Sequence, residues 1–417
     1  MKYLIIHGEG FADGAQSSLG GKSLLDAAAT PHMDRLARTG EFGWVAVPVE
    51  GVAPTGELTG LSILGYDPKK YSTGPAPLEA VGLGISVGEH DVVYRAQFVT
   101  LRSEHASTTR QAYADAKKLS PLAMLEDATA GDIDTESARE LIEALNEGIG
   151  SEVIQFYPGS GHQHYMVWVN GKSRAACRDP QLVQGHPIGE HLPSGDGEEV
   201  LRKLMDASVV VLRDHPVNLD RRDAGQHTAT CMWLWGQGRS PQWPPLTEKL
   251  GLNGAMVSLS PLHKGMGVCA GFDSVETDGA EAGVAALTAL TALGRQAIGE
   301  LAKRDLVYVH VNLAAMADAG SHGADSLKAV EAFDRDLVGP LVQALTSRGP
   351  GRVLLVCDPC DRPSSQRGPT YQALTVLAEG GAVGERAPGI GFSESQATGA
   401  GGAARDALKL MVRLVKK

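Results

Sequence analysis

Runs of consecutive apolar residues alternate along this chain with stretches in which apolar residues recur at helical spacing. The run from Lys2 to Ile6 is typical of a buried strand, and the turn His7-Gly8-Glu9-Gly10 follows it. Thr30 and Pro31 predict a helix start, because threonine caps helices and proline suits their first turn. Further strands are predicted at residues 45–49, 91–101, 255–259, 306–311 and 353–357, and further helices at residues 285–301, 326–346 and 403–415. This alternation predicts an α/β fold with a mostly parallel sheet covered by helices on both faces.

The pattern changes in the middle of the chain. Residues 134–146 form a strongly amphipathic helical stretch, and two short runs at 153–157 and 164–169 predict strands around a turn. Residues 178–199 are rich in proline, glycine and charge, which is typical of a surface loop. A chain of 417 residues is also too long for one ordinary core. We therefore expect a split core domain, residues 1–105 and 226–417, with a smaller α+β domain inserted at residues 106–225.

Composition narrows the class of partner and the compartment. The formal net charge of -11 disfavours nucleic acid and anionic membranes as partners, because both require clustered Lys and Arg. The opening MKYLIIHGEG has neither the basic start nor the long apolar stretch of a signal peptide, and no run reaches the roughly 18 apolar residues of a membrane span. Five cysteines in a chain of this length indicate reduced thiols. We expect a cytoplasmic protein.

Acidic residues and a histidine follow three of the predicted core strands. Glu9 follows the first strand, Asp318 and His322 follow the strand at 306–311, and Asp358 follows the strand at 353–357. Ligands bind at strand ends in doubly wound sheets, and these groups are suitable ligands for a divalent metal. Each residue equally suits a turn or a helix cap, so a metal site and a purely structural role both stay open.

Several longer segments carry a family resemblance. They are residues 20–40 (GGKSLLDAAATPHMDRLARTG), 61–85 (LSILGYDPKKYSTGPAPLEAVGLGI), 134–147, 215–222 (HPVNLDRR), 233–238 (WLWGQG), and 306–345 with LVYVHV and KAVEAFDRDLVGPLVQAL. In this order they closely resemble the archaeal-type cofactor-independent phosphoglycerate mutases of the alkaline phosphatase superfamily. The resemblance implies phosphoryl transfer between the 3- and 2-hydroxyls of glycerate, through a hydroxyl nucleophile held by two Mn²⁺ or similar ions.

The nucleophile of the family is missing at its expected position. The family motif P-G-S-D-x-x-N-L-S becomes Pro54-Thr55-Gly56-Glu57-Leu58-Thr59-Gly60-Leu61-Ser62, which puts Gly56 in place of the serine. Glycine has no oxygen with which to attack phosphorus. Thr55, one residue earlier, or Thr59 is the alternative nucleophile, since threonine performs this role elsewhere in the superfamily.

The metal ligands of the family are also substituted. Glu9 replaces the aspartate of the G-D-G motif, Asp358 is retained, and Pro359 and Gly368 replace imidazole ligands. Asp318 and His322 have the spacing of the D-x-x-G-H pair, but an ungapped alignment puts Ala315 and Ala319 there instead, and both registers stay open. If the chain binds a metal, we expect Mn²⁺ or Mg²⁺.

Positions that would handle the substrate are partly kept. Arg95, His164 and Lys264 match the family and are candidate substrate-binding residues, although arginines at such positions also brace loops. Other basic or proton-donating positions have become Pro75, Asp132 and Gln163, which weakens a site for a phosphoester.

Two hypotheses follow from these substitutions. The first is a mutase-like protein with impaired or repurposed chemistry, which binds a small phosphorylated acid or a protein partner. The second is an active metal-dependent mutase or phosphotransferase that uses a substitute nucleophile such as Thr55. A weaker variant of the second keeps one metal and hydrolyses its substrate with bound water.

Overall fold

The computed structural model describes residues 1–12, 14–46, 55–103, 118–276, 286–313, 324–359, 372–380, 384–399 and 405–416. The chain divides into a core unit, Met1–Ser72 with Trp243–Lys417, and an inserted unit, Thr73–Gln242. The sequence predicted the boundaries at residues 105/106 and 225/226. The division lies elsewhere because β3 (Val92–Arg102), expected as a core strand, pairs with β7 (Cys231–Arg239) and β6 (Gln163–Trp168) in the sheet of the inserted unit.

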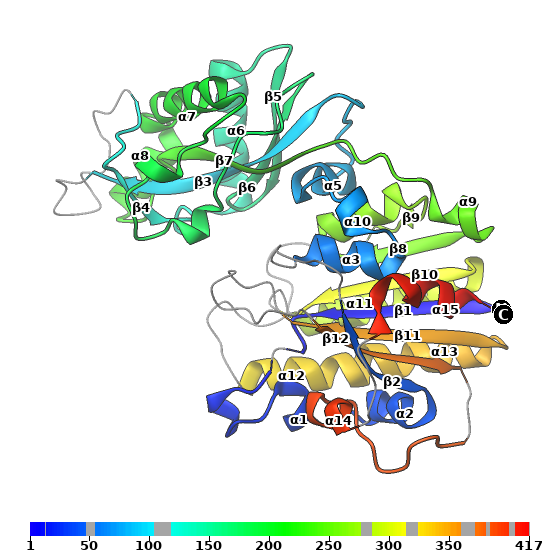
Figure 1. Ribbon diagram of the computed structural model, residues 1–417. Helices are drawn as coiled ribbons and strands as arrows, with labels where there is room; N and C mark the ends of the chain where they lie inside the picture. Colours follow the sequence, from blue (N-terminus) through cyan, green and yellow to red (C-terminus); the bar gives the residue numbers. More distant parts are fainter. Residues whose placement is uncertain are drawn as a thin grey trace. The chain divides into compact units, whose positions relative to one another are not determined.

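The core unit contains a mostly parallel sheet, as the sequence predicted (Figure 1). Its order in the described residues is β13-β2-β12-β11-β1-β10-β8-β9. The strands are β1 (Lys2–Glu9), β2 (Glu41–Ala46), β8 (Gly254–Ser258), β9 (Asp273–Ser274), β10 (Leu306–Asn312), β11 (Gly351–Asp358), β12 (Gln372–Glu379) and β13 (Arg405–Asp406). β1 lies in the middle, parallel to both β10 and β11, while β12 runs antiparallel to β11 and β2.

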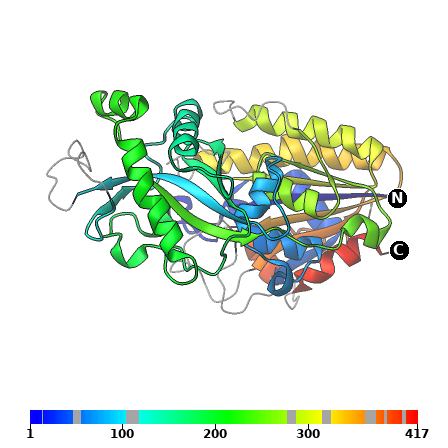
Figure 2. The same cartoon turned by 90° about the horizontal axis from the view of Figure 1, so that it is seen from above.

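Helices cover both faces of this sheet. Figure 1 places α3 and α10 on one face and α12 and α13 on the other. The helices of the core unit are α1 (Leu24–Ala27), α2 (Pro31–Thr39), α3 (Gly56–Leu64), α4 (Pro68–Tyr71), α9 (Leu246–Leu250), α10 (Pro261–Cys269), α11 (Ala286–Lys303), α12 (Ala324–Ala332), α13 (Gly339–Ser347), α14 (Glu394–Gly399) and α15 (Leu410–Val415). A π-helical segment, Phe333–Val338, joins α12 to α13, so the helix predicted at 326–346 is continuous. In Figure 2 the yellow-green α11 runs beside this gold helix.

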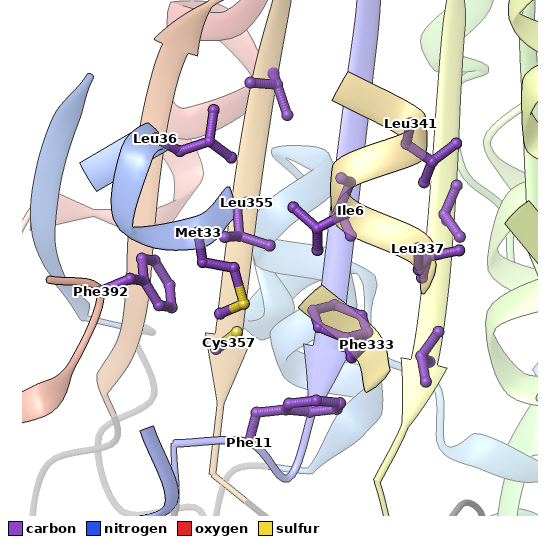
Figure 3. Packing of buried hydrophobic residues seen from close by; sticks show 14 of the residues in the cluster. Ile6, Phe11, Met33, Leu36, Phe333, Leu337, Leu341, Leu355, Cys357 and Phe392 are labelled. Atoms are coloured by element: carbon purple, nitrogen blue, oxygen red, sulfur yellow. The ribbon is translucent and has the colours of Figure 1, made fainter. Parts of the chain in front are cut away.

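The main hydrophobic core lies on one face of the sheet. Alternate residues of β1, β10 and β11 point into it, including Ile6, Val309 and Leu355. They pack against Met33 of α2 and Phe333 of the π-helical segment, as Figure 3 shows. Because side chains alternate along a strand, the residues between them point to the opposite face. His7, Glu9, His310 and Asp358 belong to that opposite face.

In the described residues the inserted unit contains a five-stranded antiparallel sheet with helices. Its elements are α5 (Pro75–Gly82), β3, β4 (Met124–Asp127), α6 (Thr135–Ile149), β5 (Ile154–Ser160), β6, α7 (Glu198–Arg213), α8 (Pro216–Asp223) and β7. A second core cluster forms between the sheet and α6 and α7, with Trp233 among its largest fully buried side chains. Of residues 178–199, predicted as a loop, Pro180–Leu182 and Gly189–His191 form short 3-10 turns, and helix α7 already begins at Glu198.

Local predictions failed where tertiary contacts overrode them. Strand β1 continues to Glu9 instead of turning at His7, because its backbone pairs with β10 and β11 over that whole length. Helix α2 begins at Pro31 as predicted, but the side chain of Thr30 does not cap it. The carboxylate of Asp334 takes that role and accepts hydrogen bonds from the backbone N–H groups of His32 (3.1 Å) and Met33 (2.7 Å). Strands β7 and β12 were not predicted. Among the described helices none is both long enough and apolar enough to cross a membrane.

Candidate functional site

Polar side chains meet at the carboxyl ends of the central parallel strands. The register pairs His7 of β1 with His310 of β10, and His310 in turn with Ser258 of β8. Two residues further along, Glu9 pairs with Asp358 of β11. These strand residues therefore form two adjacent rows on the sheet face opposite the hydrophobic core.

A third histidine, His263 of α10, completes a cluster with His7 and His310. All three side chains are buried, and one ligand atom of each lies within 4.8 Å of the others. The imidazoles of His263 and His310 stack with centroids 3.3 Å apart, and His7 meets both rings edge-on at 5.5 and 5.1 Å. We call these three residues the histidine cluster.

Hydroxyl groups hold the Nδ1 atom of every histidine in the cluster. The contacts are His7 with the Tyr308 hydroxyl (3.0 Å), His263 with Ser260 (3.3 Å) and His310 with Ser258 (3.0 Å). Because each Nδ1 is occupied, the Nε2 atom of each ring is left for other partners.

Two carboxylates lie against the Nε2 side of the cluster. Glu9 Oε2 is 3.0 Å from His310 Nε2 in a hydrogen bond. Asp358 Oδ1 lies 3.3 Å from His7 Nε2, without hydrogen-bond alignment. The backbone fixes both acids, since Gly10 N–H donates to the Asp358 carbonyl (3.0 Å) and Leu313 N–H donates to the Glu9 carbonyl (2.9 Å).

Burial makes this part of the molecule a poor environment for cationic imidazole. It holds the pKa of His263 well below the ordinary value, and the neighbouring His310 adds to the effect. Burial and His7 likewise lower the pKa of His310. These two rings are therefore neutral near pH 7, and neutral imidazole is the form that binds metals.

Helix α3 brings Gly56 against Glu9. A β-carbon added at Gly56 would lie 3.1 Å from Glu9 Oε1, so the longer acid occupies the space next to the missing side chain. One turn later, a β-carbon at Gly60 would lie 2.6 Å from Met266 Sδ and 3.6 Å from His263 Nε2. The two glycines allow the helix to lie close to the carboxylate and to the histidine cluster.

The two candidate substitute nucleophiles differ in their contacts. The hydroxyl of Thr55 caps α3 by accepting a hydrogen bond from Leu58 N–H at 3.5 Å. The hydroxyl of Thr59 is buried and has no hydrogen-bond partner among the described residues.

The structure brings Glu9, Gly56 and Asp358 together but leaves other predicted residues elsewhere or undescribed. Pro359 directly follows Asp358 and offers no side-chain donor. Lys264 is half-buried on α10, where burial lowers its pKa. Three further predicted positions, Asp318, His322 and Gly368, lie outside the described residues.

The sequence analysis missed the histidine cluster. It placed His7 in a turn, read His310 as part of an apolar run, and did not single out His263. A signal was present in the alternation: His7 and Glu9, like Tyr308 and His310, are separated by one residue and therefore share a sheet face. His263 had no such signal, because its position on α10 depends on tertiary packing.

In the inserted unit, Arg95 makes a structural ion pair. Its guanidinium donates to both carboxylate oxygens of Glu79 and lies 4.6 Å from the ring centroid of Trp235. Burial disfavours the charged guanidinium, but the neighbouring Glu79 outweighs it and raises the pKa of Arg95. Arg95 is therefore engaged with protein groups.

His164, the other predicted substrate residue of this unit, is also buried. Gly159 N–H donates to its Nδ1 at 3.1 Å, and its ring packs edge-on against Phe98. Its Nε2 atom is buried without a hydrogen-bond partner in the described residues, and burial lowers its pKa to about 3.

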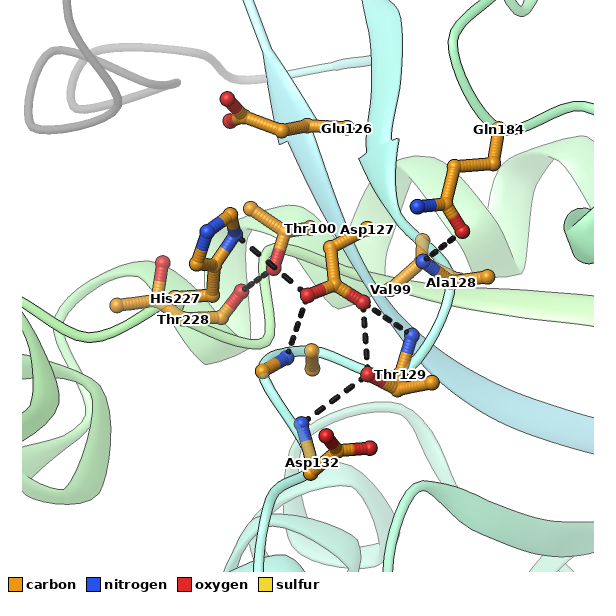
Figure 4. Close-up of polar contacts among 12 residues, drawn as sticks. Val99, Thr100, Glu126, Asp127, Ala128, Thr129, Asp132, Gln184, His227 and Thr228 are labelled. Carbon is orange, nitrogen blue, oxygen red and sulfur yellow. Dashed lines mark hydrogen bonds and ion pairs between the residues drawn. The ribbon is translucent and has the colours of Figure 1, made fainter. Parts of the chain in front are cut away.

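Asp127 organises a strained turn in the same unit (Figure 4). Its carboxylate accepts hydrogen bonds from the backbone N–H (2.7 Å) and hydroxyl (2.7 Å) of Thr129 and from Gly131 N–H (3.1 Å). Ala130, Gly131 and Asp132 all have positive φ angles. The guanidinium of Arg221 donates to the carbonyls of this turn and of His227. Asp132 thus stands in a left-handed turn fixed by protein hydrogen bonds.

Comparison with known sequences places the chain in a family. A family profile described as 2,3-bisphosphoglycerate-independent phosphoglycerate mutase matches residues 37–218. A probable enzyme of that name from Geobacter sulfurreducens is 36% identical over 419 residues, covering 100% of both chains. The mutase of Methanosarcina barkeri is 37% identical over 362 residues, covering 86% of this chain and 85% of its own.

Solved structures share the fold. A Pyrococcus horikoshii protein matches with a TM-score of 0.70 and 22% identity, covering 99% of this chain and 96% of its own. The cofactor-independent phosphoglycerate mutase of Thermoplasma acidophilum matches with a TM-score of 0.60 and 22% identity over 100% and 99% of the two chains. The chain belongs to the 2,3-bisphosphoglycerate-independent phosphoglycerate mutase family.

Proposed function

We propose that this member of the phosphoglycerate mutase family does not interconvert phosphoglycerates through a phosphorylated serine, and that it acts instead as a cytoplasmic binding or regulatory protein. Its ligand in this role is a small phosphorylated acid or a protein partner. One observation carries the proposal: Gly56 stands where the resemblance puts the nucleophile, and Glu9 fills the adjacent space. No hydroxyl is available at that point of α3.

The two-ion site of the family does not fit the donors described in this chain. Of the family ligand positions, Glu9 and Asp358 carry carboxylates, and Pro359 carries none where an imidazole is needed. The register pairs the two acids directly across neighbouring strands. Among the described residues, two acids without the serine and that imidazole are too few to hold two ions and a phosphoryl group between them.

The substrate positions of the inserted unit support the same proposal. Arg95 is bound to Glu79, and His164 is neutral and enclosed. Each has a structural role that accounts for its presence. The fact that these two residues match the family therefore does not argue that the chain converts phosphoglycerates.

An alternative function keeps catalysis with a different hydroxyl. The unpartnered, buried hydroxyl of Thr59 is the observation that favours it, since it lies on α3 three residues after Gly56. Thr55 is less suited, because its hydroxyl already caps the helix.

Turnover of 3-phosphoglycerate decides between the two functions. The purified chain is assayed with Mn²⁺ and, separately, with Zn²⁺, beside Thr55→Ala and Thr59→Val. We expect no conversion above the protein-free reaction in any of the three proteins. Conversion by the unmodified chain that Thr59→Val or Thr55→Ala abolishes would refute the proposal and identify the substitute nucleophile.

A combined reversion provides the positive control. Glu9→Asp, Gly56→Ser, Pro359→His and Gly368→His together restore residue types that the resemblance assigns to the active family. Conversion by this variant, absent from the unmodified chain, would attribute the loss of turnover to these positions.

A further inference from the structure

Two buried nitrogen atoms of the histidine cluster have no hydrogen-bond partner among the described residues. They are His7 Nε2 and His263 Nε2, and both side chains are fully buried. A buried polar atom left without a hydrogen bond costs about 1–3 kcal/mol. Orphan atoms of this kind require an explanation such as an ion or a catalytic role.

The ring orientations in the cluster match those of metal-binding histidines. A histidine that binds a metal usually makes a hydrogen bond through its second ring nitrogen, which fixes the tautomer and the direction of the ring. Here the second nitrogen is Nδ1 in every case, bonded to Tyr308, Ser260 or Ser258. A proton on Nδ1 of His7 and of His263 leaves the lone pair of each Nε2 available to a cation, and in His310 the Nε2 atom faces the Glu9 carboxylate.

We propose that His7, His263 and His310 bind one divalent transition-metal ion of the zinc type, with Glu9 as the carboxylate ligand. Tetrahedral coordination with Zn–N bonds of about 2.0–2.1 Å separates ligand nitrogens by about 3.4 Å. The ligand atoms of the three histidines already lie within 4.8 Å of one another. Coordination requires the stacked rings of His263 and His310 to tilt apart, which rotation of their side chains allows.

Glu9 is in position to be the fourth ligand. Its Oε2 atom already contacts His310 Nε2 at 3.0 Å. An ion that binds between these two atoms replaces their hydrogen bond; the single proton of neutral His310 then stands on Nδ1, facing the Ser258 hydroxyl, and Nε2 and the Glu9 carboxylate both bind the ion. The site then has three nitrogen donors and one oxygen donor.

The donor set indicates which metal the site prefers. Imidazole suits Zn²⁺, Co²⁺, Ni²⁺ and Cu²⁺, whereas Mn²⁺ and Mg²⁺ favour oxygen ligands. None of the three histidines occupies a position that the resemblance assigns to a metal ligand. The inferred site therefore shares Glu9 with the two-ion site of the family but takes its three nitrogen ligands from other positions, and zinc binding there is measured without any turnover.

Metal titration of the full chain tests the site. The protein is stripped with a chelator and titrated with Zn²⁺ by calorimetry, with Co²⁺ absorption as the probe of coordination geometry. We expect one ion per chain and the visible absorption of tetrahedral Co²⁺. The double variant His7→Leu/His263→Leu should lose affinity by on the order of 100-fold or more, since removing even outer-shell partners costs about 10–100-fold.

Milder variants keep the test valid if that double variant does not fold. Tyr308→Phe and Ser260→Ala remove only the hydroxyls that hold His7 and His263, and each should weaken Zn²⁺ binding by about 10–100-fold. His164→Asn, in the inserted unit, is the matched control and should bind Zn²⁺ like the unmodified chain. Absence of stoichiometric Zn²⁺ binding, or equal binding by the unmodified chain and the folded cluster variants, would overturn the proposal.

Discussion

Among the described residues, both units bury histidines whose Nε2 atom makes no hydrogen bond, but the two sets have different surroundings. In the inserted unit, His164 packs against Phe98 and its Nε2 meets no hydrogen-bond partner. In the core unit, His7 and His263 converge with His310 and with the carboxylate of Glu9. An isolated orphan nitrogen therefore indicates a neutral core histidine, whereas several that converge from different elements indicate a binding site.

The acids of the two units differ in the same way as the histidines, and Asp127 represents the inserted unit. Asp127 and Arg221 direct their charged groups at backbone amides and carbonyls. Burial works against ionised Asp127, but the hydrogen bonds from Thr129 are sufficient to lower its pKa overall. Charged groups satisfied by backbone in this way stabilise a loop and leave little capacity for a ligand.

The largest expected effect concerns the strained turn. Arg221→Ala removes hydrogen bonds to the carbonyls of Ala130, Gly131 and His227, and it should lower the free energy of unfolding of the inserted unit by about 3 kcal/mol. Arg222→Ala is the control, since Arg222 makes a single bond to the Arg213 carbonyl at 3.2 Å. Urea unfolding followed by hydrogen exchange of β3 and β7 measures both. Equal effects of the two changes would mean that Arg221 does not fix the turn.

The next largest expected effect is the contribution of His164 to the pH dependence of the free energy of unfolding. Its folded pKa of about 3 lies below the unfolded value of about 6.5, so the unfolded chain binds more protons between these values. The stability contribution is complete above about pH 6.5 and falls by up to about 1.4 kcal/mol per pH unit as pH decreases through this window. His164→Asn keeps an acceptor for Gly159 N–H and should flatten this decline between pH 6 and pH 5, whereas exposed His186→Asn should not. An unchanged slope in His164→Asn would assign the acid sensitivity to other groups.

A smaller effect tests the fit between α3 and the first strand. Gly56→Ser places a β-carbon 3.1 Å from Glu9 Oε1 and should destabilise the core unit by about 1–2 kcal/mol, which is the usual cost of overpacking. Glu9→Asp/Gly56→Ser should recover most of that loss, because the shorter acid withdraws from the added side chain. Thermal unfolding of the single and double variants measures the coupling. Additive losses would show that the two positions are independent.

Much of the fold was predictable because its signals are local. The apolar runs at β1, β10 and β11 and the helical spacing of residues 326–346 are continuous in sequence, and the structure confirms them. The domain boundaries could not be predicted in the same way. Strand β3 has the same apolar character whether it pairs with the core sheet or with β7. Glu9 and Asp358 were proposed from the apolar runs that precede them, and they are the last residues of β1 and β11. The histidine cluster was not predicted, since only the pairing of β1 with β10 and the packing of α10 bring His7, His310 and His263 together.

The central place of β1 has a consequence for how the chain is made. Its two neighbours, β10 and β11, are synthesised about 300 and 350 residues after it. At translation rates of about 5–20 residues per second, the first strand waits roughly 15–70 s for its second neighbour. The inserted unit, by contrast, is one contiguous segment of the chain, Thr73–Gln242, whose strands all emerge before β10. Its folding can therefore precede closure of the core sheet, and a ribosome that stalls between these points would expose a finished insertion beside an unpaired amino-terminal strand.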